Sequence, residues 1–276
     1  GTAQEKADSS TKRWLSYRPD LKVLDCTIRD GGLMNNHRFG DEVFAAVYRA
    51  CVESGVDYME VGYRSSKRIF SPEEHGAWKY STEDDLRRLV GENDTGLKLS
   101  VMADAERTDY HTDILPAKDS VLDMIRVASY IHQIPTAIDM IKDAHDKGYE
   151  TTLNLMAISA VPDRELDQAL AALAESEVDV IYIVDSFGSL YMEQTHYLVR
   201  QYMQFAAPAG KRVGFHAHNN QQLGYANTIQ AIITGAHMVD GSMAGLGRGA
   251  GNCQVELLLG FLHNPKFRLR PILECI

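Results

Sequence analysis

The feature that most constrains the fold of this chain is a regular alternation of short apolar runs with amphipathic stretches. Eight runs have the length and composition of buried strands, at 21–28, 58–63, 97–103, 124–130, 151–159, 180–188, 212–218 and 237–245. Helical spacing of apolar residues lies between most of them, at 41–55, 81–90, 134–149, 163–177, 192–205, 223–236 and 252–262. Repeated strand–helix alternation predicts parallel strands joined by right-handed crossovers.

The number of these units indicates which parallel fold to expect. Eight units in roughly 250 residues match the size of a (β/α)8 barrel. An open, doubly wound sheet is the alternative, and it typically carries a glycine-rich phosphate-binding turn after its first strand. Here the first run is followed by Arg29-Asp30-Gly31-Gly32, which brings charge instead. We therefore expect an α/β fold, a single (β/α)8 TIM barrel at 21–276, preceded by a polar N-terminal arm at 1–20.

Composition excludes several classes of partner. The 276 residues include 28 Lys and Arg against 38 Asp and Glu, a formal net charge of −10, whereas a nucleic-acid binder needs a basic face. No stretch approaches the roughly 18 uninterrupted apolar residues of a spanning helix, and the first residues lack the apolar core of a secretory signal. Four scattered cysteines are typical of reduced thiols. We expect a cytoplasmic protein without nucleic-acid or membrane partners. Its oligomeric state stays open, with a homo-oligomer as one option.

Polar residues near the ends of the apolar runs are the candidate site residues, because catalytic groups of such a barrel lie at the carboxyl ends of the strands. They are Thr27, Arg29, Asp30, Glu60, Tyr63, Asp104, Arg126, Ser129, Asn154, Ser159, Asp185, Ser186, His216, His218, Asn219, Asn220, Asp240 and Ser242. From this set we assign substrate binding to Glu60, Arg126, Asn154, Ser186 and Asn219.

The most specific signal is the pair His216-Ala217-His218. Alternate residues of a strand point to the same side, so H-x-H aims two imidazoles at one point, as a metal site requires. Asp30, after another strand, supplies an oxygen ligand. Two histidines and one carboxylate leave open positions for water and substrate, which is typical of a catalytic metal site. Oxygen-rich substrate ligation suits Mg²⁺ or Mn²⁺, with Zn²⁺ as a third candidate.

Three charged residues near the expected metal need partners. Arg29 is either one half of a salt bridge on the barrel rim or a fixed cation that stabilises an oxyanion on the substrate. Arg29 and Asp30 can serve one site only if the strand end bends, which Gly31 and Gly32 permit. Glu60 and Arg126 fall within apolar runs, and a lone buried charge is costly. We therefore expect them to pair with each other or with Arg29, in a supporting role more than in the chemistry.

The segment GLGRGAGN at 245–252 is dense in glycine. It is either a flexible loop or a place where backbone amides approach a substrate carboxylate or phosphate at a helix N-terminus. Asn252 is well placed to cap the last helix, and the residues alone do not separate that role from metal ligation.

These segments together resemble a known family. LDCTIRDGG (24–32), GFHAHNNQQLGYANT (214–228) and the GLGRGAGN loop are similar to the DRE-TIM metallolyases, or HMGL-like superfamily, and the resemblance covers residues 21–262. The superfamily includes 4-hydroxy-2-oxovalerate aldolases, HMG-CoA lyase and the isopropylmalate, citramalate and homocitrate synthases. The resemblance implies that Asp30, His216, His218 and Asn252 bind a divalent metal and that Arg29 stabilises an enolate oxygen. The implied reaction makes or breaks a C–C bond beside a metal-chelated 2-oxo acid.

Departures from the family pattern favour the aldolase branch. HMG-CoA lyases carry a catalytic cysteine inside the glycine-rich loop, whereas 245–251 contains none and Cys253 follows the loop. The synthases usually continue H-x-H-N with aspartate, where this chain has Asn220. The chain looks like a short aldolase with the common metal core.

The general base is the least constrained assignment. The hydroxyoxovalerate aldolases place a histidine base where this chain has Leu33, and the nearby loop offers His37 instead. Two glycines precede that loop, so His37 could fold over the barrel mouth, although a surface histidine explains it equally well. Tyr63 and a metal-bound water are the rival bases.

Three hypotheses for function follow. The first is a metal-dependent aldolase or lyase that acts on a 2-oxo acid through a pyruvate-type enolate. The second is a Claisen-type condensing enzyme of the isopropylmalate or citramalate synthase type, which uses an acyl-CoA. The third, a catalytically silent binding barrel, is disfavoured by the complete set of Arg29, Asp30, His216 and His218.

Overall fold

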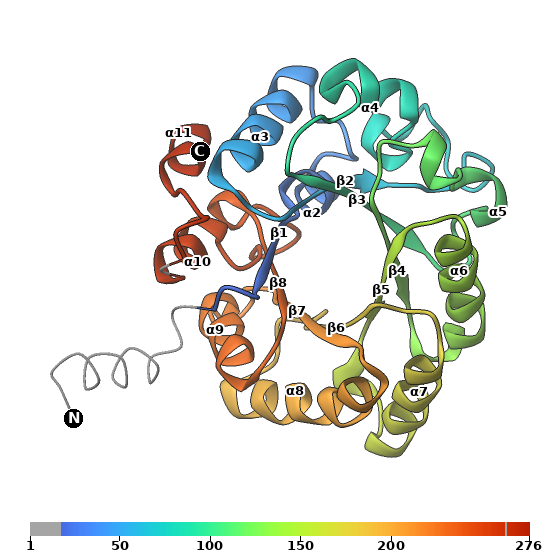
Figure 1. Cartoon of the computed structure of the whole chain (residues 1–276), viewed down its shortest axis with the longest axis vertical. Helices are drawn as coiled ribbons and strands as arrows, with labels where there is room; N and C mark the ends of the chain where they lie inside the picture. Colours follow the sequence, from blue (N-terminus) through green and yellow to red (C-terminus); the bar gives the residue numbers. More distant parts are fainter. Residues whose placement is uncertain (1–17, 263) are drawn as a thin grey trace, which may run out of the picture.

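The computed structural model describes residues 18–262 and 264–276. Eight parallel strands form a closed barrel in the order β1 to β8, with β1 pairing β8 to complete the ring and the helices around the outside (Figure 1). The predicted (β/α)8 TIM barrel is therefore confirmed. Most of the predicted arm, 1–17, lies outside the described residues, so the domain boundaries stay a prediction.

Each predicted apolar run coincides with one strand of the barrel, although β3 ends one residue after its run and β5 begins one residue before. The strands are β1 Lys22–Asp25, β2 Tyr58–Tyr63, β3 Lys98–Asp104, β4 Met124–Ser129, β5 Glu150–Leu155, β6 Val180–Val184, β7 Arg212–His216 and β8 Met238–Gly241. Several end before the run does, because the last residues of the run already turn into the loops of the site. His218, for example, lies beyond the end of β7, in an isolated bridge with Asn252.

Each predicted helical stretch coincides with a helix, and the described chain also has three short α-helices that were not predicted, α2, α5 and α11. The α-helices are α2 Thr27–Gly31, α3 Asp41–Ser54, α4 Glu83–Val90, α5 Tyr110–Asp113, α6 Ile134–Asp146, α7 Asp163–Glu175, α8 Met192–Ala206, α9 Gly224–Thr234, α10 Val255–Phe261 and α11 Arg270–Cys275. The 3-10 turns are η1 Gly32–Met34, η2 Ala77–Lys79, η3 Ala117–Asp119, η4 Ile131–Gln133, η5 Ile158–Ala160, η6 Ala207–Ala209 and η7 Met243–Gly245.

The first strand is shorter than its apolar run predicted, and this changes how Arg29 and Asp30 are presented. β1 ends at Asp25, and the chain turns at once into the one-turn helix α2. The Asp25 carboxylate starts this helix by accepting hydrogen bonds from the backbone N–H (3.0 Å) and the hydroxyl (2.8 Å) of Thr27. Consecutive helical residues are about 100° apart instead of 180°, so both side chains can reach one site without a bent strand.

The two glycines after Asp30 act by close approach and not by bending a strand. Both have right-handed helical backbone angles. A Cβ on Gly31 would lie 2.9 Å from a methyl carbon of Leu246, and one on Gly32 would lie 2.6 Å from Nδ1 of His37. Their lack of a side chain therefore lets the β8–α10 loop and the loop carrying His37 pack against α2.

The core has an outer and an inner part. The larger part packs apolar strand residues against the surrounding helices, and a smaller cluster fills the barrel interior. Above that inner cluster lies a layer of fully buried charged and polar side chains, which includes Glu60, Arg126 and Asp240. This layer separates the apolar floor of the barrel from its carboxyl-terminal mouth.

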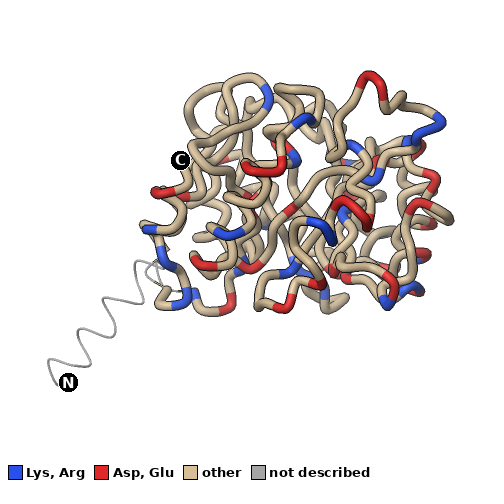
Figure 2. The backbone as a smooth tube through the Cα atoms, turned by 90° about the horizontal axis from the view of Figure 1, so that it is seen from above, with Lys and Arg blue, Asp and Glu red and all other residues tan. Residues whose placement is uncertain are grey.

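The surface of the described chain fits the composition. Acidic and basic positions are interspersed around the barrel instead of separating onto two faces (Figure 2). None of the described helices is long and apolar enough to cross a membrane. The four cysteines are free, as expected, and three of them are buried.

Candidate active site

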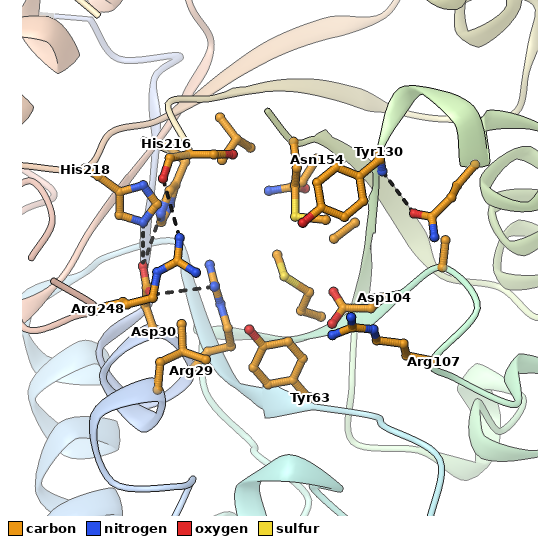
Figure 3. Close-up of a pocket in the computed structure, with 18 of the residues that line it drawn as sticks. Arg29, Asp30, Tyr63, Asp104, Arg107, Tyr130, Asn154, His216, His218 and Arg248 are labelled. Carbon is orange, nitrogen blue, oxygen red and sulfur yellow. Dashed lines mark hydrogen bonds and ion pairs between the residues drawn. The ribbon is translucent and has the colours of Figure 1, made fainter. Parts of the chain in front are cut away.

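A pocket of about 240 Å³ opens at the carboxyl ends of the strands (Figure 3). Residues from β2 to β7, from α2 and from the loops that follow the strands line it. Its polar lining residues are Arg29, Asp30, Tyr63, Lys79, Asp104, Arg107, Tyr130, Gln133, Asn154, Ser186, His216, His218 and Arg248. The pocket therefore lies where a barrel of this kind places its chemistry.

One side of the pocket carries a buried cluster of potential metal ligands, Asp30, His216 and His218. Oδ2 of Asp30 lies 3.1 Å from Nε2 of His216 and 3.7 Å from Nε2 of His218. The ligand atoms of all three residues lie within 4.8 Å of one another. Burial pushes the pKa of Asp30 up, but the charge of Arg29 and the hydrogen bonds from both histidines outweigh it and hold that pKa well below its usual range.

The other ring nitrogen of each histidine is held by a fixed acceptor. Nδ1 of His216 lies 2.8 Å from Oδ2 of Asp240, and Nδ1 of His218 lies 2.7 Å from the backbone oxygen of Asp185. Both acceptors take the N–H on Nδ1, so Nε2 of each ring is the atom that faces Asp30. Such partners typically fix the tautomer and the orientation of metal-binding histidines.

Asn252 contacts this cluster from the glycine-rich loop. Its Nδ2 donates to Oδ2 of Asp30 at 2.6 Å, and its backbone forms the bridge with His218. Of the two roles left open for Asn252, the helix cap is wrong, because α10 begins only at Val255 with Gln254 at the cap position. A Cβ on Gly247 would lie 2.6 Å from the Asn252 amide, so the glycines allow the loop to fold closely over this side chain.

The donor set fits a divalent cation. Oδ1 of Asp30 and Oδ1 of Asn252 are buried without a hydrogen-bond partner in the described part of the chain. Two imidazole nitrogens and two buried, unsatisfied oxygens are the ligand types that Mn²⁺, Mg²⁺ and Zn²⁺ accept. The residues present are therefore compatible with a metal at this corner of the pocket.

A chain of buried ion pairs supports this corner from below. Nε of Arg29 donates to Oε1 of Glu60 at 2.5 Å, Nη1 of Arg126 lies 3.3 Å from the same oxygen, and Nη2 of Arg126 donates to Asp240 at 2.5 Å. Asp240 also accepts from the Tyr182 hydroxyl at 2.9 Å. The expected pairing of Glu60 with Arg126 and Arg29 is confirmed, and the chain links Arg29 to the residue that orients His216.

Arg29 is the member of this chain that faces the pocket. Burial opposes its charge, but the carboxylates of Glu60 and Asp30 outweigh burial and raise the pKa of Arg29 further. Its guanidinium lies over the ring of Tyr63 at 5.9 Å and 3.8 Å from Oδ1 of Asp30. A permanently charged, oriented donor thus lies directly beside the metal-ligand cluster.

His37 is neither a lid nor a surface residue. It is 3% exposed, packs edge-to-face against Tyr63 with ring centroids 5.2 Å apart, and is not among the residues that line the pocket in the described chain. Burial, reinforced by the charge of Lys79, lowers the pKa of His37 to about 3. Tyr63 separates it from the pocket, so the structure does not bring His37 to the reacting groups.

The predicted substrate-binding residues divide into two groups. Asn154 and Ser186 line the pocket, whereas Glu60 and Arg126 are fully buried beneath it in the ion-pair chain. Asn219 is used locally instead, since its side chain accepts a hydrogen bond from the backbone of Gly224 at the start of α9. The latter three residues therefore act through their neighbours.

Several pocket residues have no role in the motifs of the sequence. Asp104 ends β3, so its position was a signal, but nothing in its surroundings indicated a function. Lys79 belongs to η2, in the irregular stretch between β2 and α4, and Arg107 follows β3 in a turn. Both point to a wall of the pocket that the motifs do not describe.

Comparison with known families shows to which family this barrel belongs. The family model described as HMGL-like matches residues 20–270, which is nearly the whole described barrel. The chain belongs to the HMGL-like family. Among its relatives, the 4-hydroxy-2-oxovalerate aldolase 3 of Rhodococcus opacus is 31% identical over 87% of this chain and 70% of its own length. The 4-hydroxy-2-oxovalerate aldolase 1 of Rhodococcus erythropolis is 30% identical over 87% of this chain and 68% of its own.

Solved structures agree with this family assignment. The N-terminal domain of a proposed aldolase from Bacteroides vulgatus has a TM-score of 0.81 and 33% identity, covering 92% of this chain and 84% of that domain. A Bacillus subtilis HMG-CoA lyase has a TM-score of 0.76, over 94% of this chain and 92% of the lyase, but only 17% identity. At this low identity, the similarity to the lyase is evidence for the fold only.

Proposed function

We propose that this HMGL-like protein is a divalent-metal-dependent aldolase that cleaves a 4-hydroxy-2-oxo acid into pyruvate and an aldehyde, and that forms the same C–C bond in reverse. The single observation that carries the proposal is the joint position of Asp30, His216 and His218 beside the charged Arg29, on one side of a small pocket. The kinship with the two Rhodococcus aldolases supports the choice of reaction.

Asp30, His216, His218 and Asn252 would hold the metal, for which we propose Mn²⁺ or Mg²⁺, with Zn²⁺ as a further candidate. When bound, the metal would act as a Lewis acid on the carboxylate and 2-oxo oxygens of the substrate. The protein's part is to orient both histidines so that Nε2 of each faces the site, which their Nδ1 partners do.

Arg29 stabilises the negative charge that develops on the 2-oxo oxygen as the bond between C3 and C4 breaks. Glu60 fixes the guanidinium through Nε, which leaves its remaining N–H groups free to donate to that oxygen. A donor that is already oriented and desolvated costs little reorganisation during the reaction.

The C4 hydroxyl must lose its proton as this bond breaks, and Asp104 is the group we propose as acceptor. Its side chain has neither a hydrogen bond nor an ion pair in the described part of the chain, and it lines the pocket across from the histidines (Figure 3). Burial raises the pKa of Asp104 in spite of Lys79, Arg29 and Arg107 nearby, which makes the carboxylate a better base. Burial likewise raises the pKa of Tyr63, so Tyr63 serves as a hydrogen-bond donor.

The test is pyruvate release from 4-hydroxy-2-oxovalerate, followed with lactate dehydrogenase and NADH in the absence of CoA. We expect Mn²⁺- or Mg²⁺-dependent release that Asp30→Asn abolishes and that Asp146→Asn, a change at an exposed carboxylate, leaves intact. Turnover that requires an acyl-CoA would instead support the condensing-enzyme alternative, which the comparisons do not favour. The cytoplasmic location and a homo-oligomeric state stay predictions.

A further inference from the structure

Lys79 is a buried cation that has no ion-paired carboxylate in the described part of the chain. The residue is 7% exposed and lines the pocket. Its ammonium lies over the rings of Phe70 at 4.1 Å and Tyr63 at 4.7 Å, and within residues 18–262 and 264–276 it forms no hydrogen bond or ion pair. Burial lowers the pKa of Lys79. Desolvating a charge without pairing it is costly, so its position calls for an anion that arrives from the pocket.

A second cation, Arg107, lies on the same wall. It follows β3, is exposed, and its guanidinium points toward the pocket beside Asp104 (Figure 3). Like Lys79, Arg107 forms no ion pair with any described carboxylate. Asp104 is the single carboxylate on this wall, so the wall has an excess of positive charge before any substrate binds, and the excess grows when Asp104 takes up a proton.

The 2-oxo acid end of the substrate does not account for these two cations. That end belongs to the metal-ligand cluster and Arg29, which lie across the pocket, and Arg29 already has Glu60 as its counter-charge. The ring of Tyr63 lies between Arg29 and the wall that holds Arg107 and Asp104 (Figure 3). With the 2-oxo acid end held by that cluster, the part of the pocket beside Lys79 is left for the aldehyde half of the substrate.

We propose that Lys79 and Arg107 form an anion-binding subsite for the aldehyde half, so that the preferred substrate is a 4-hydroxy-2-oxo acid with a carboxylate or phosphate at its far end. This inference rests on the proposed aldolase function and deepens it, because it names the class of aldehyde. A neutral, short-chain aldehyde would leave Lys79 desolvated and unpaired in the complex. Charge-assisted hydrogen bonds to an anionic tail would satisfy it.

The experiment measures kcat/KM for the condensation of pyruvate with four aldehydes: acetaldehyde, glyoxylate, succinate semialdehyde and glyceraldehyde 3-phosphate. We expect the wild-type protein to prefer at least one anionic aldehyde over acetaldehyde by about tenfold or more. The two carboxylates and the phosphate tell the two sources of the anionic tail apart. Equal kcat/KM for neutral and anionic aldehydes in the wild type would overturn the inference.

Variants test whether Lys79 is responsible for the preference for anionic aldehydes. In Lys79→Met the ratio of kcat/KM for the preferred anionic aldehyde to that for acetaldehyde should fall by about 10- to 100-fold, mainly through KM. Lys98→Met is the matched control, since Lys98 also lies over a tyrosine ring, that of Tyr58, but is exposed at the start of β3. Its ratio should equal that of the wild type, and a ratio that Lys79→Met leaves unchanged would overturn the inference.

A second variant and a second reaction separate failure of the subsite from misfolding and from failure of the proposed function. If Lys79→Met does not fold, Arg107→Gln decides, because this residue is exposed and its replacement should lower the same ratio severalfold; an unchanged ratio contradicts the subsite. Decarboxylation of oxaloacetate by the wild type forms pyruvate enolate without an aldehyde. If that reaction is absent, the proposed function fails; if it is present without a preference for anionic aldehydes, only this inference fails.

Discussion

Nδ1 of His216 lies 2.8 Å from Oδ2 of Asp240, and this contact decides which nitrogen of the ring faces Asp30. Asp240 is itself fixed by Arg126 and Tyr182, so the orientation of a ligand on β7 depends on residues of β4, β6 and β8. His218 differs, since its Nδ1 partner is the backbone oxygen of Asp185. A side-chain substitution can therefore disturb the support of His216 but not that of His218.

This asymmetry gives the first prediction. Asp240→Asn should weaken Mn²⁺ binding by about 10- to 100-fold, because loss of such a partner frees the tautomer and orientation of the histidine. The matched control is Asp185→Asn, which keeps the backbone acceptor of His218 and should bind Mn²⁺ as the wild type does. Calorimetric titration of both metal-free variants measures this, and equal affinities in the two would contradict the assigned role of Asp240.

The second prediction concerns Arg29. Arg29→Ala should retain the metal and the fold but lower kcat by about 10²–10³, the usual effect of removing one preorganised oxyanion donor. Metal content after dialysis, far-ultraviolet circular dichroism and steady-state kinetics provide the readout. A variant with near-normal kcat would return Arg29 to a purely structural salt bridge with Glu60.

A third prediction separates Asp104 from the reactions that need no base. Asp104→Asn should abolish cleavage of the 4-hydroxy-2-oxo acid, because no carboxylate is left to accept the hydroxyl proton. The same variant should still decarboxylate oxaloacetate, which forms the same enolate without removing a hydroxyl proton. Loss of both reactions to the same extent would show that Asp104 only shapes the pocket.

His37 provides the converse case. Its backbone has a φ of +61°, which asparagine tolerates better than most residues, so His37→Asn is the least disruptive change. Because His37 is buried behind Tyr63 and its pKa is lowered to about 3, we expect this variant to change cleavage and decarboxylation by the same factor. Selective loss of cleavage would make His37 the base after all.

The last prediction concerns the pH dependence of stability. Burial raises the pKa of Asp25 to about 7 from its ordinary value of 3.8, in spite of two hydrogen bonds from Thr27. The unfolded chain therefore loses this proton at lower pH than the folded chain, and the stabilising contribution of the protonated form is lost as pH rises through this window.

Asp25→Asn removes this titration. Relative to the wild type, its free energy of unfolding should rise by about 2 kcal/mol between pH 5.5 and pH 8. Urea unfolding at both pH values gives the difference, with Asp146→Asn at an exposed site as the control whose difference stays constant. A pH-independent difference for Asp25→Asn would mean that Asp25 is ionised throughout.

The sequence was sufficient for the barrel, which depends on a pattern with a fixed period, and it named Asp30 and the two histidines, although Asp30 lies on α2 and His218 beyond the end of β7. Apolar runs of strand length specify eight buried strands, and H-x-H near a strand end brings two rings together regardless of the surrounding loops. The helical turn that presents Arg29 does not follow from the sequence, because its five residues are apolar and charged in the same order as a strand end, and only the Asp25–Thr27 contact starts a helix there.

The positions of pocket residues that lie on irregular loops could not be predicted from the sequence. Lys79 reaches the pocket because the stretch between β2 and α4 folds back over Tyr63, and no periodicity describes that stretch. The burial of His37 depends on the close approach that Gly32 permits. Such placements follow from tertiary packing of loops, which a local pattern does not encode.

The central claim is tested most directly by pyruvate release from a 4-hydroxy-2-oxo acid before and after the metal is removed. Chelator-treated and dialysed wild-type protein should release pyruvate at the background rate and regain activity on addition of Mn²⁺ or Mg²⁺, whereas Asp30→Asn should not regain it. Full activity in the metal-free wild-type protein would contradict the account, as would the absence of pyruvate under every metal condition.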